Sequence, residues 1–144
     1  MVDLAGLLLC VSLLVVSSIH VYWAFGGRWG GQHVVPTDPA SATPTFTPSR
    51  TATLAVALAL GIAACVVMLY LGWFTVPLPT TLVSVGMWGL TIVLIARTVG
   101  DFKYAGLSKR VKTTPFARLD TRIYTPLCGV LGLLALLVVV FGPG

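Results

Sequence analysis

Charged residues are the scarcest class in this sequence. They make up 9% of its 144 residues, whereas 57% of the residues are hydrophobic, and no glutamate is present. A soluble globular protein has about 25% charged residues on average, so this composition excludes that class. A lipid bilayer is the environment that solvates so much apolar surface. The length suits one membrane domain only, and we expect residues 1–144 to form a single domain.

Several kinds of chemistry lack the residues they need. The three cysteines are dispersed, with no C-x-x-C pair, which argues against a thiol–disulfide enzyme and a thiolate metal site. The chain has no H-E-x-x-H, no G-x-S-x-G and no phosphate-binding glycine loop. His20 and Cys128 alone are too few ligands for a metal. We therefore expect no metal and no cofactor; these absences leave open whether the protein is an enzyme, and we favour a role that is not enzymatic.

Four apolar runs are each long enough to cross a bilayer as a helix, which needs about 20 residues. They are rich in leucine and alanine and do not alternate, which favours helices over strands. We expect helices at about residues 4–25, 52–74, 80–99 and 123–141. The predicted fold class is all-α: a polytopic membrane protein with a four-transmembrane-helix bundle. Thr125-Pro126 indicates an N-cap with proline at the first helical position, restarting the last helix after a short break.

The basic residues predict the orientation. Every Lys and Arg lies in or beside two long connections, at about residues 26–51 and 100–122. The positive-inside rule places these connections in the cytoplasm and both termini outside. No acid falls inside a predicted span, which argues against a proton-coupled exporter. The net charge of +5 favours membrane lipids, anionic on the cytoplasmic side, as the partner instead of nucleic acid.

The second connection has an amphipathic pattern. Tyr104, Leu107 and Val111 share one helical face between residues 101 and 112. The basic residues fall away from this face: Lys103, Lys109, Arg110 and Lys112. The pattern predicts a helix in the headgroup plane. One interpretation is an electrostatic anchor, and the other is a rim that binds phosphate or carboxylate.

Small residues recur along the predicted spans at four-residue spacing, as in Ala57, Gly61 and Cys65. Such stripes let helix backbones approach closely in lipid. With Cys10 on the first span, they predict the interior of the bundle. The same faces would also serve a homo-oligomer or a partner membrane protein.

His20 is the only histidine in a predicted span, near its cytoplasmic end. Polar groups at that depth usually face the bundle or a wet cavity. In one interpretation it is a neutral imidazole bonded to a nearby carbonyl or tyrosine, with Tyr22 and Trp23 as interfacial aromatic residues. In the other it carries protons, ligates a metal or donates a hydrogen bond to a bound head group.

Two polar pairs have a spacing of four residues near the cytoplasmic end. Arg97 and Asp101 are one pair, so their side chains can meet on one helix face, and Asp120 and Tyr124 are the other. We expect a salt-bridged collar that closes the bundle. The alternative is that Asp101 or Asp120 acts as a base beside His20.

These motifs carry a resemblance to a known family. The motifs are His20-Val21-Tyr22-Trp23-Ala24 with Gly26-Gly27-Arg28-Trp29-Gly30, then Val99-Gly100-Asp101-Phe102-Lys103-Tyr104, then Phe116-Ala117-Arg118-Leu119-Asp120-Thr121 with Tyr124 and Pro126-Leu127-Cys128. In this order they resemble the domain-of-unknown-function family 3995 over nearly the whole chain. The resemblance implies a small bacterial four-helix protein of the plasma membrane, and it implies no activity. Leu107-Ser108 departs from the aromatic residues usual there, which weakens an aromatic binding wall at that point.

The function expected from these residues is binding of a lipid or small amphiphile at the cytoplasmic mouth. Arg97 and Lys103 would hold an anionic head group, and His20 would hydrogen-bond it. A membrane-embedded enzyme or redox subunit that uses His20 with Asp101 or Asp120 is one alternative, and a structural subunit of a membrane complex is another. The candidate ligand-binding residues are His20, Tyr22, Trp23, Arg97, Asp101, Lys103, Tyr104, Asp120, Tyr124 and Cys128.

Overall fold

The computed structural model describes residues 1–31, 34–41 and 43–143. Its helices are α1 (Val2–Ala24), α2 (Arg50–Tyr70), α3 (Thr80–Val99), α4 (Pro115–Leu119), the π-helix η2 (Asp120–Tyr124) and α5 (Thr125–Phe141). The last three join into one helical run, Pro115–Phe141, so four helices are long and apolar enough to cross a membrane. This confirms the predicted all-α fold class with four spans.

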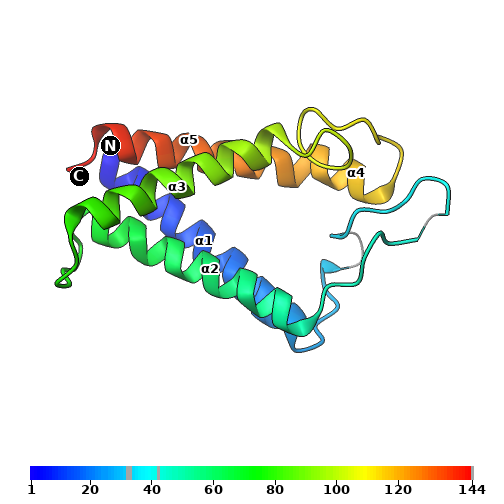
Figure 1. Cartoon of the computed structure of the whole chain (residues 1–144), viewed down its shortest axis with the longest axis horizontal. Coiled ribbons are helices and arrows are strands. Elements are labelled where there is room, and N and C mark those ends of the chain that lie inside the picture. Colours follow the sequence, from blue (N-terminus) through cyan, green and yellow to red (C-terminus); the bar gives the residue numbers. More distant parts are fainter. Residues whose placement is uncertain (32–33, 42, 144) are drawn as a thin grey trace.

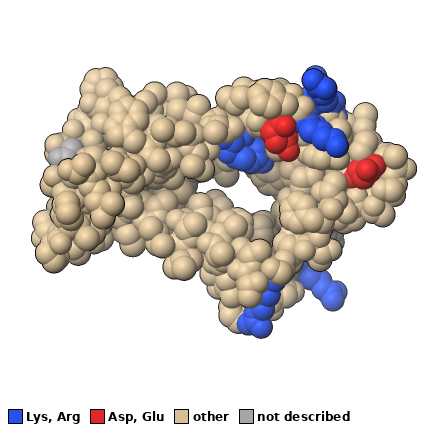
Figure 2. All heavy atoms as spheres, viewed as in Figure 1, with Lys and Arg blue, Asp and Glu red and all other residues tan. Residues whose placement is uncertain are grey.

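Two helix pairs form the molecule (Figure 1). α1 packs along α2, and α3 packs along α5. The pairs meet at the end that holds both termini and the short turn between α2 and α3, and they diverge toward the end that holds the two long connections. We call these the terminal end and the loop end. On the face that Figure 2 shows, every visible charged residue lies toward the loop end.

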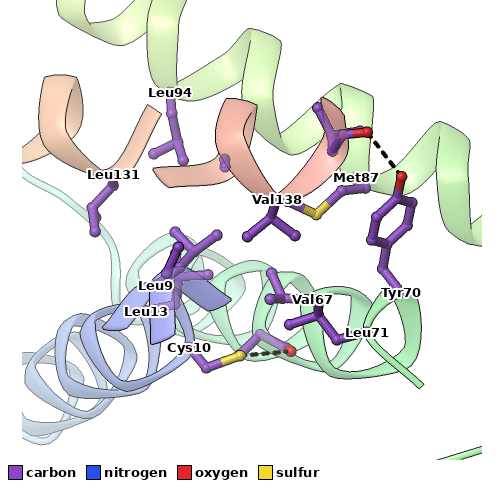
Figure 3. Packing of buried hydrophobic residues seen from close by; sticks show 14 residues of the cluster. Leu9, Cys10, Leu13, Val67, Tyr70, Leu71, Met87, Leu94, Leu131 and Val138 are labelled. Carbon is purple, nitrogen blue, oxygen red and sulfur yellow. Dashed lines mark hydrogen bonds between the residues drawn. The ribbon is translucent and has the colours of Figure 1, made fainter. Parts of the chain in front are cut away.

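The hydrophobic core belongs to the terminal end. Figure 3 shows side chains from all four long helices meeting there. Two core side chains make hydrogen bonds to a neighbouring helix: the Tyr70 hydroxyl donates to the Val139 carbonyl at 2.9 Å, and the Cys10 thiol donates to the Ala64 carbonyl at 3.5 Å. The core consists of Ala5, Leu9, Cys10, Leu13, Ala64, Val67, Tyr70, Leu71, Met87, Leu94, Leu131, Ala135, Val138 and Val139.

The interior faces were predicted only in part. Cys10 and Ala57 are buried as expected, but Cys65 is exposed. Ala57 and Ala64 are seven residues apart, which returns a helix to nearly the same face after two turns. Cys65 lies one residue beyond that face and points away from it.

α2 is displaced relative to the predicted window of 52–74. Ser49 caps its start, since the Ser49 side chain accepts a hydrogen bond from the Ala52 N–H at 3.1 Å. The helix ends at Tyr70, and Gly72 follows with a φ of 70°. That left-handed conformation suits glycine and reverses the chain, so the last residues of the window lie in the turn.

The fourth helix begins earlier than predicted, and the break at Thr125-Pro126 is absent. Thr114 is the cap: its hydroxyl accepts from the Ala117 N–H at 3.2 Å, and Pro115 takes the first helical position. Pro126 therefore lies inside a continuous helix, where it lacks an N–H and its ring opposes the carbonyl four residues back. The Thr125 N–H bonds to the Asp120 carbonyl, five residues back, and the extra residue makes the π-helix.

The predicted amphipathic helix over residues 101–112 is wrong, because the segment is a series of bends and turns. Gly100 and Gly106 have φ values of 96° and 83°, which a continuing α-helix does not allow. Their backbones cross in contact, so a side chain on either glycine would collide with the other strand of the loop. Leu107, expected on the apolar face, is 75% exposed.

Candidate functional site

The first polar cluster surrounds Asp120 at the loop end of the α3–α5 pair. Its Oδ1 accepts from Arg97 Nη2 at 2.7 Å. Its Oδ2 accepts from Lys109 Nζ at 2.7 Å, from the Gly106 N–H at 2.9 Å and from the Thr125 hydroxyl at 2.9 Å. The carboxylate is fully buried, and the Lys109 side chain is only 5% exposed. We call these five residues the Asp120 cluster.

Local structure explains why these groups meet. Arg97 stands in the last turn of α3, and the tight crossing of Gly100 and Gly106 turns the connection back over that helix end. Asp120 and Thr125 are five residues apart, the spacing that a π-turn places on one face. Because the fourth helix starts at Pro115, Asp120 lies within it, whereas the sequence analysis put no acid in a span.

The predicted pairing of Arg97 with Asp101 is wrong. Gly100 ends α3, so Asp101 leaves the helix face that it was expected to share with Arg97. Asp101 Oδ1 instead accepts three backbone N–H groups, from Lys103, Tyr104 and Ala105, at 2.7–3.0 Å. Burial acts to raise the pKa of Asp101, but these N–H groups outweigh it and lower the pKa below its ordinary value.

The Arg97 guanidinium is not fully used by the Asp120 cluster. Its side chain is 36% exposed, and its Nη1 is enclosed without a hydrogen-bond partner in the described part of the chain. The other predicted residues on the side of the α3–α5 pair are Lys103, Tyr104, Tyr124 and Cys128. Lys103 Nζ stands 4.9 Å above the ring of Tyr104, the ring centroids of Tyr124 and Phe116 are 6.2 Å apart, and Cys128 is half-buried.

The second site is a cavity of about 500 Å³ at the loop end of the α1–α2 pair. We call it the His20 cavity. The last turns of α1, the first turns of α2 and parts of the first connection form its wall. Its lining residues are His20, Trp23, Val34, Val35, Phe46, Thr47, Pro48, Ser49, Ala52, Thr53 and Val56.

His20 and Trp23 are brought together as the sequence analysis expected. His20 Nδ1 lies 2.8 Å from the Val16 carbonyl oxygen, and the ring meets Trp23 edge-on, with centroids 5.1 Å apart. The Trp23 indole N–H donates to the Trp29 carbonyl at 2.8 Å, which ties the first connection to α1. Tyr22 stands apart from this cavity and lines a shallow depression along α1 with Trp29.

The ten predicted residues are thus divided between the two helix pairs. His20 and Trp23 belong to the α1–α2 pair, and Arg97 and Asp120 belong to the α3–α5 pair. Figure 2 shows an opening through the molecule between the two pairs. The ion pairs thus close one helix pair onto its own connection and do not form a collar around the whole bundle.

Sequence reasoning missed three members of the Asp120 cluster: Lys109, Gly106 and Thr125. Lys109 was assigned to a solvated basic face. The signal that could have found them was Thr114-Pro115, a cap followed by proline. This signal starts the last helix early enough to place Asp120 within it. A carboxylate buried there requires cationic partners.

The two acids among the predicted site residues are both engaged by groups of the chain itself. Asp120 has both oxygens engaged, and Asp101 accepts backbone N–H groups. Within the described ranges no three His, Cys or Asp side chains gather closely enough to hold a metal ion.

Comparison with known proteins gives one result. Searches of curated proteins and of solved structures found no match. A family model described as "Protein of unknown function (DUF3995)" matches residues 13–135, from the middle of α1 to most of the way along α5. That span takes in both the Asp120 cluster and the His20 cavity. The chain belongs to the DUF3995 family.

Proposed function

We propose that this multi-pass membrane protein binds a lipid or small amphiphile at its loop end, with the apolar part of the ligand in the His20 cavity. The observation that carries the proposal is the cavity itself. Its volume of about 500 Å³ lies within the range of about 300–1,000 Å³ typical of ligand pockets. Its walls are mostly aliphatic and aromatic, with His20 and the hydroxyl residues Thr47, Ser49 and Thr53 among them.

The depth of the cavity suits an amphiphile. His20 is four residues from the end of α1 at Ala24, about 6 Å along the helix axis at 1.5 Å per residue. In a spanning helix this is the boundary between acyl chains and head groups. A ligand held there would keep its polar group near water and its chain in hydrocarbon.

The divergence of the helix pairs gives such a ligand a route. The core holds the pairs together only at the terminal end, and the opening in Figure 2 runs across the long axis of the molecule. When the helices span a bilayer, an opening in this direction faces the lipid. A ligand would then enter sideways from the leaflet.

The basic residues take a different role from the one first expected. Arg97 and Lys109 already share the charge of Asp120. Exposed cations of the second connection, such as Lys103, Arg110 and Lys112, would meet anionic lipid head groups at about 1 kcal/mol each. We propose that they anchor the loop end at the cytoplasmic face of a bacterial plasma membrane, with both termini outside.

The enzyme alternative is not carried forward, because it needs His20 beside Asp101 or Asp120. Asp120 is enclosed in the other helix pair, and Asp101 caps a turn beyond it. No specific contact favours a subunit role over ligand binding.

Native mass spectrometry of the protein gently extracted from its own membrane tests the proposal. Ala52→Phe fills the cavity, whereas Ala55→Phe adds the same ring on α2 outside the lining, as a matched control. We expect a bound species of defined mass in the wild type and in Ala55→Phe, and its loss from Ala52→Phe and from His20→Ala. A species that Ala52→Phe retains, or a wild type without any, contradicts the proposal.

A further inference from the structure

The orientation of the His20 ring limits what it can offer a ligand. Nδ1 lies 2.8 Å from the carbonyl oxygen of Val16. A carbonyl oxygen only accepts hydrogen bonds, so Nδ1 must carry the proton in this contact. In a neutral imidazole the other nitrogen, Nε2, is then a hydrogen-bond acceptor.

The described lining of the cavity offers a ligand no charged group. No Lys, Arg, Asp or Glu is found among the residues that the structure describes around the cavity. An imidazolium there would lack a counter-charge between aliphatic and aromatic walls, and an unpaired charge in such a place is costly. The nearby Arg50 guanidinium is stacked over the Phe25 ring at 4.4 Å and is not part of the lining.

Three other polar groups of the wall have partners of their own, and Thr47 is exposed. Ser49 Oγ accepts the Ala52 N–H that begins α2, and the Thr53 hydroxyl donates to the Ser49 carbonyl at 3.0 Å. The Trp23 N–H is taken by Trp29. Nε2 of His20 has no hydrogen bond to the part of the chain that the structure describes, so it is open to a donor from the ligand.

We infer that the ligand is an uncharged amphiphile with a hydroxyl group, whose O–H donates to His20 Nε2. This rests on the proposed function and names its ligand class. A carboxylate or phosphate would bring an unpaired charge and no donor, and an ammonium would bring an unpaired charge. A hydroxyl supplies the donor without either cost.

Three probes that differ only at the polar end test the inference. Each probe is a hexadecyl chain with a diazirine at its midpoint. The first ends in an alcohol, the second in the methyl ether of that alcohol, and the third in a carboxylic acid. The full-length protein is reconstituted in phosphatidylcholine vesicles at equal probe mole fractions, irradiated and digested, and labelling of the cavity peptides is measured by mass spectrometry. We expect the alcohol to label them about fivefold more than the ether, which is the effect of one net hydrogen bond, and the acid to label them no more than the ether.

Two variants connect the preference to the ring. His20→Phe keeps an aromatic ring but has no acceptor, and we expect alcohol and ether to label it equally. Ser18→Ala is the control, because Ser18 is exposed on α1 and bonds only to its own helix, at the Leu14 carbonyl. It should keep the fivefold preference. The comparison of probes in the wild type stands even if His20→Phe does not fold.

The outcomes separate the two levels of the argument. Equal labelling by all three probes, blocked by Ala52→Phe but not by Ala55→Phe, would overturn the hydroxyl inference and leave amphiphile binding intact. Preference for the acid would overturn it too, because His20 would then act as a donor. An unlabelled cavity would overturn the proposed function, and the inference with it.

Discussion

Asp120→Asn removes the charge that holds the second connection against the α3–α5 pair. The substitution keeps the shape of the side chain, but the amide no longer balances Arg97 and Lys109, both within 2.7 Å of the carboxylate. Its nitrogen also faces a donor in either orientation: Arg97 at the Oδ1 position, or Lys109 and the Gly106 N–H at the Oδ2 position. The variant thus tests whether the Asp120 cluster stabilises the fold.

The exposure of each partner sets the magnitude. Removing one partner from a buried ion pair costs about 3–5 kcal/mol. The Lys109 side chain is 5% exposed and gains nothing from water, whereas Arg97 at 36% is partly solvated. We therefore expect a loss of about 3 kcal/mol for Asp120→Asn, mostly from Lys109. Lys109→Met should cost less, about 2 kcal/mol, because Asp120 keeps Arg97.

Unfolding in mixed micelles by added dodecyl sulfate, followed by tryptophan fluorescence, gives these free energies. The double variant Asp120→Asn/Lys109→Met should cost about 1–2 kcal/mol less than the sum of the singles, since it removes the buried charge together with its partner. Asp3→Asn, an exposed acid in the first turn of α1, is the control and should cost less than about 1 kcal/mol. A loss below about 1 kcal/mol for Asp120→Asn, or strict additivity in the double variant, would refute the reasoning.

Three further predictions concern the loop end. Gly106→Ala should cost more than about 2 kcal/mol of stability in the same assay, because its φ is positive and a Cβ would strike the Gly100 backbone. Gly89→Ala is the control: its Cβ would meet open space, so it should cost almost nothing. Equal effects of the two substitutions would contradict this. Asp101 has a lowered pKa, so the stability that it contributes is complete above the unfolded pKa of about 3.9 and is lost as pH falls through the lower folded pKa. Asp101→Asn should therefore lose less stability than the wild type between pH 6 and pH 3. Parallel curves of stability against pH would argue against this. In a cysteine-free background, a membrane-impermeant maleimide applied to intact cells should label Val76→Cys in the short turn and not Leu107→Cys, and the reverse pattern would invert the proposed orientation.

The fold was predictable where composition alone decides it. Four runs of about 20 apolar residues leave a chain few alternatives to four helices. The conformation of the second connection was not predictable, because it follows from a tertiary contact between residues far apart in the sequence. Tyr104, Leu107 and Val111 do have helical spacing, but Gly100 and Gly106 release the backbone and the Asp120 carboxylate draws Lys109 inward. A tertiary ion pair there overrides a local pattern.

The candidate site shows the same division. His20 and Trp23 are neighbours on one helix face, so spacing was enough to place them together. Arg97 and Asp120 were both named as site residues, yet their contact with each other was not predicted. Spacing along one helix cannot reveal a contact between two helices, and the relevant helix start at Pro115 lies eight residues before the predicted one at 123.

The π-helix makes the length of the last helix matter as much as its composition. The π-helix already holds one extra residue, and each residue turns an α-helix by about 100°. Inserting a second extra residue between 120 and 124 would therefore rotate everything before it by about that angle relative to α5. Phe116 and Ala117, now 4% and 1% exposed, would swing off their packed face, and Asp120 and Thr125 would part. An insertion in the first connection would leave every helix in register. The helices should therefore tolerate insertions between α1 and α2 and exclude them between Pro115 and Pro126.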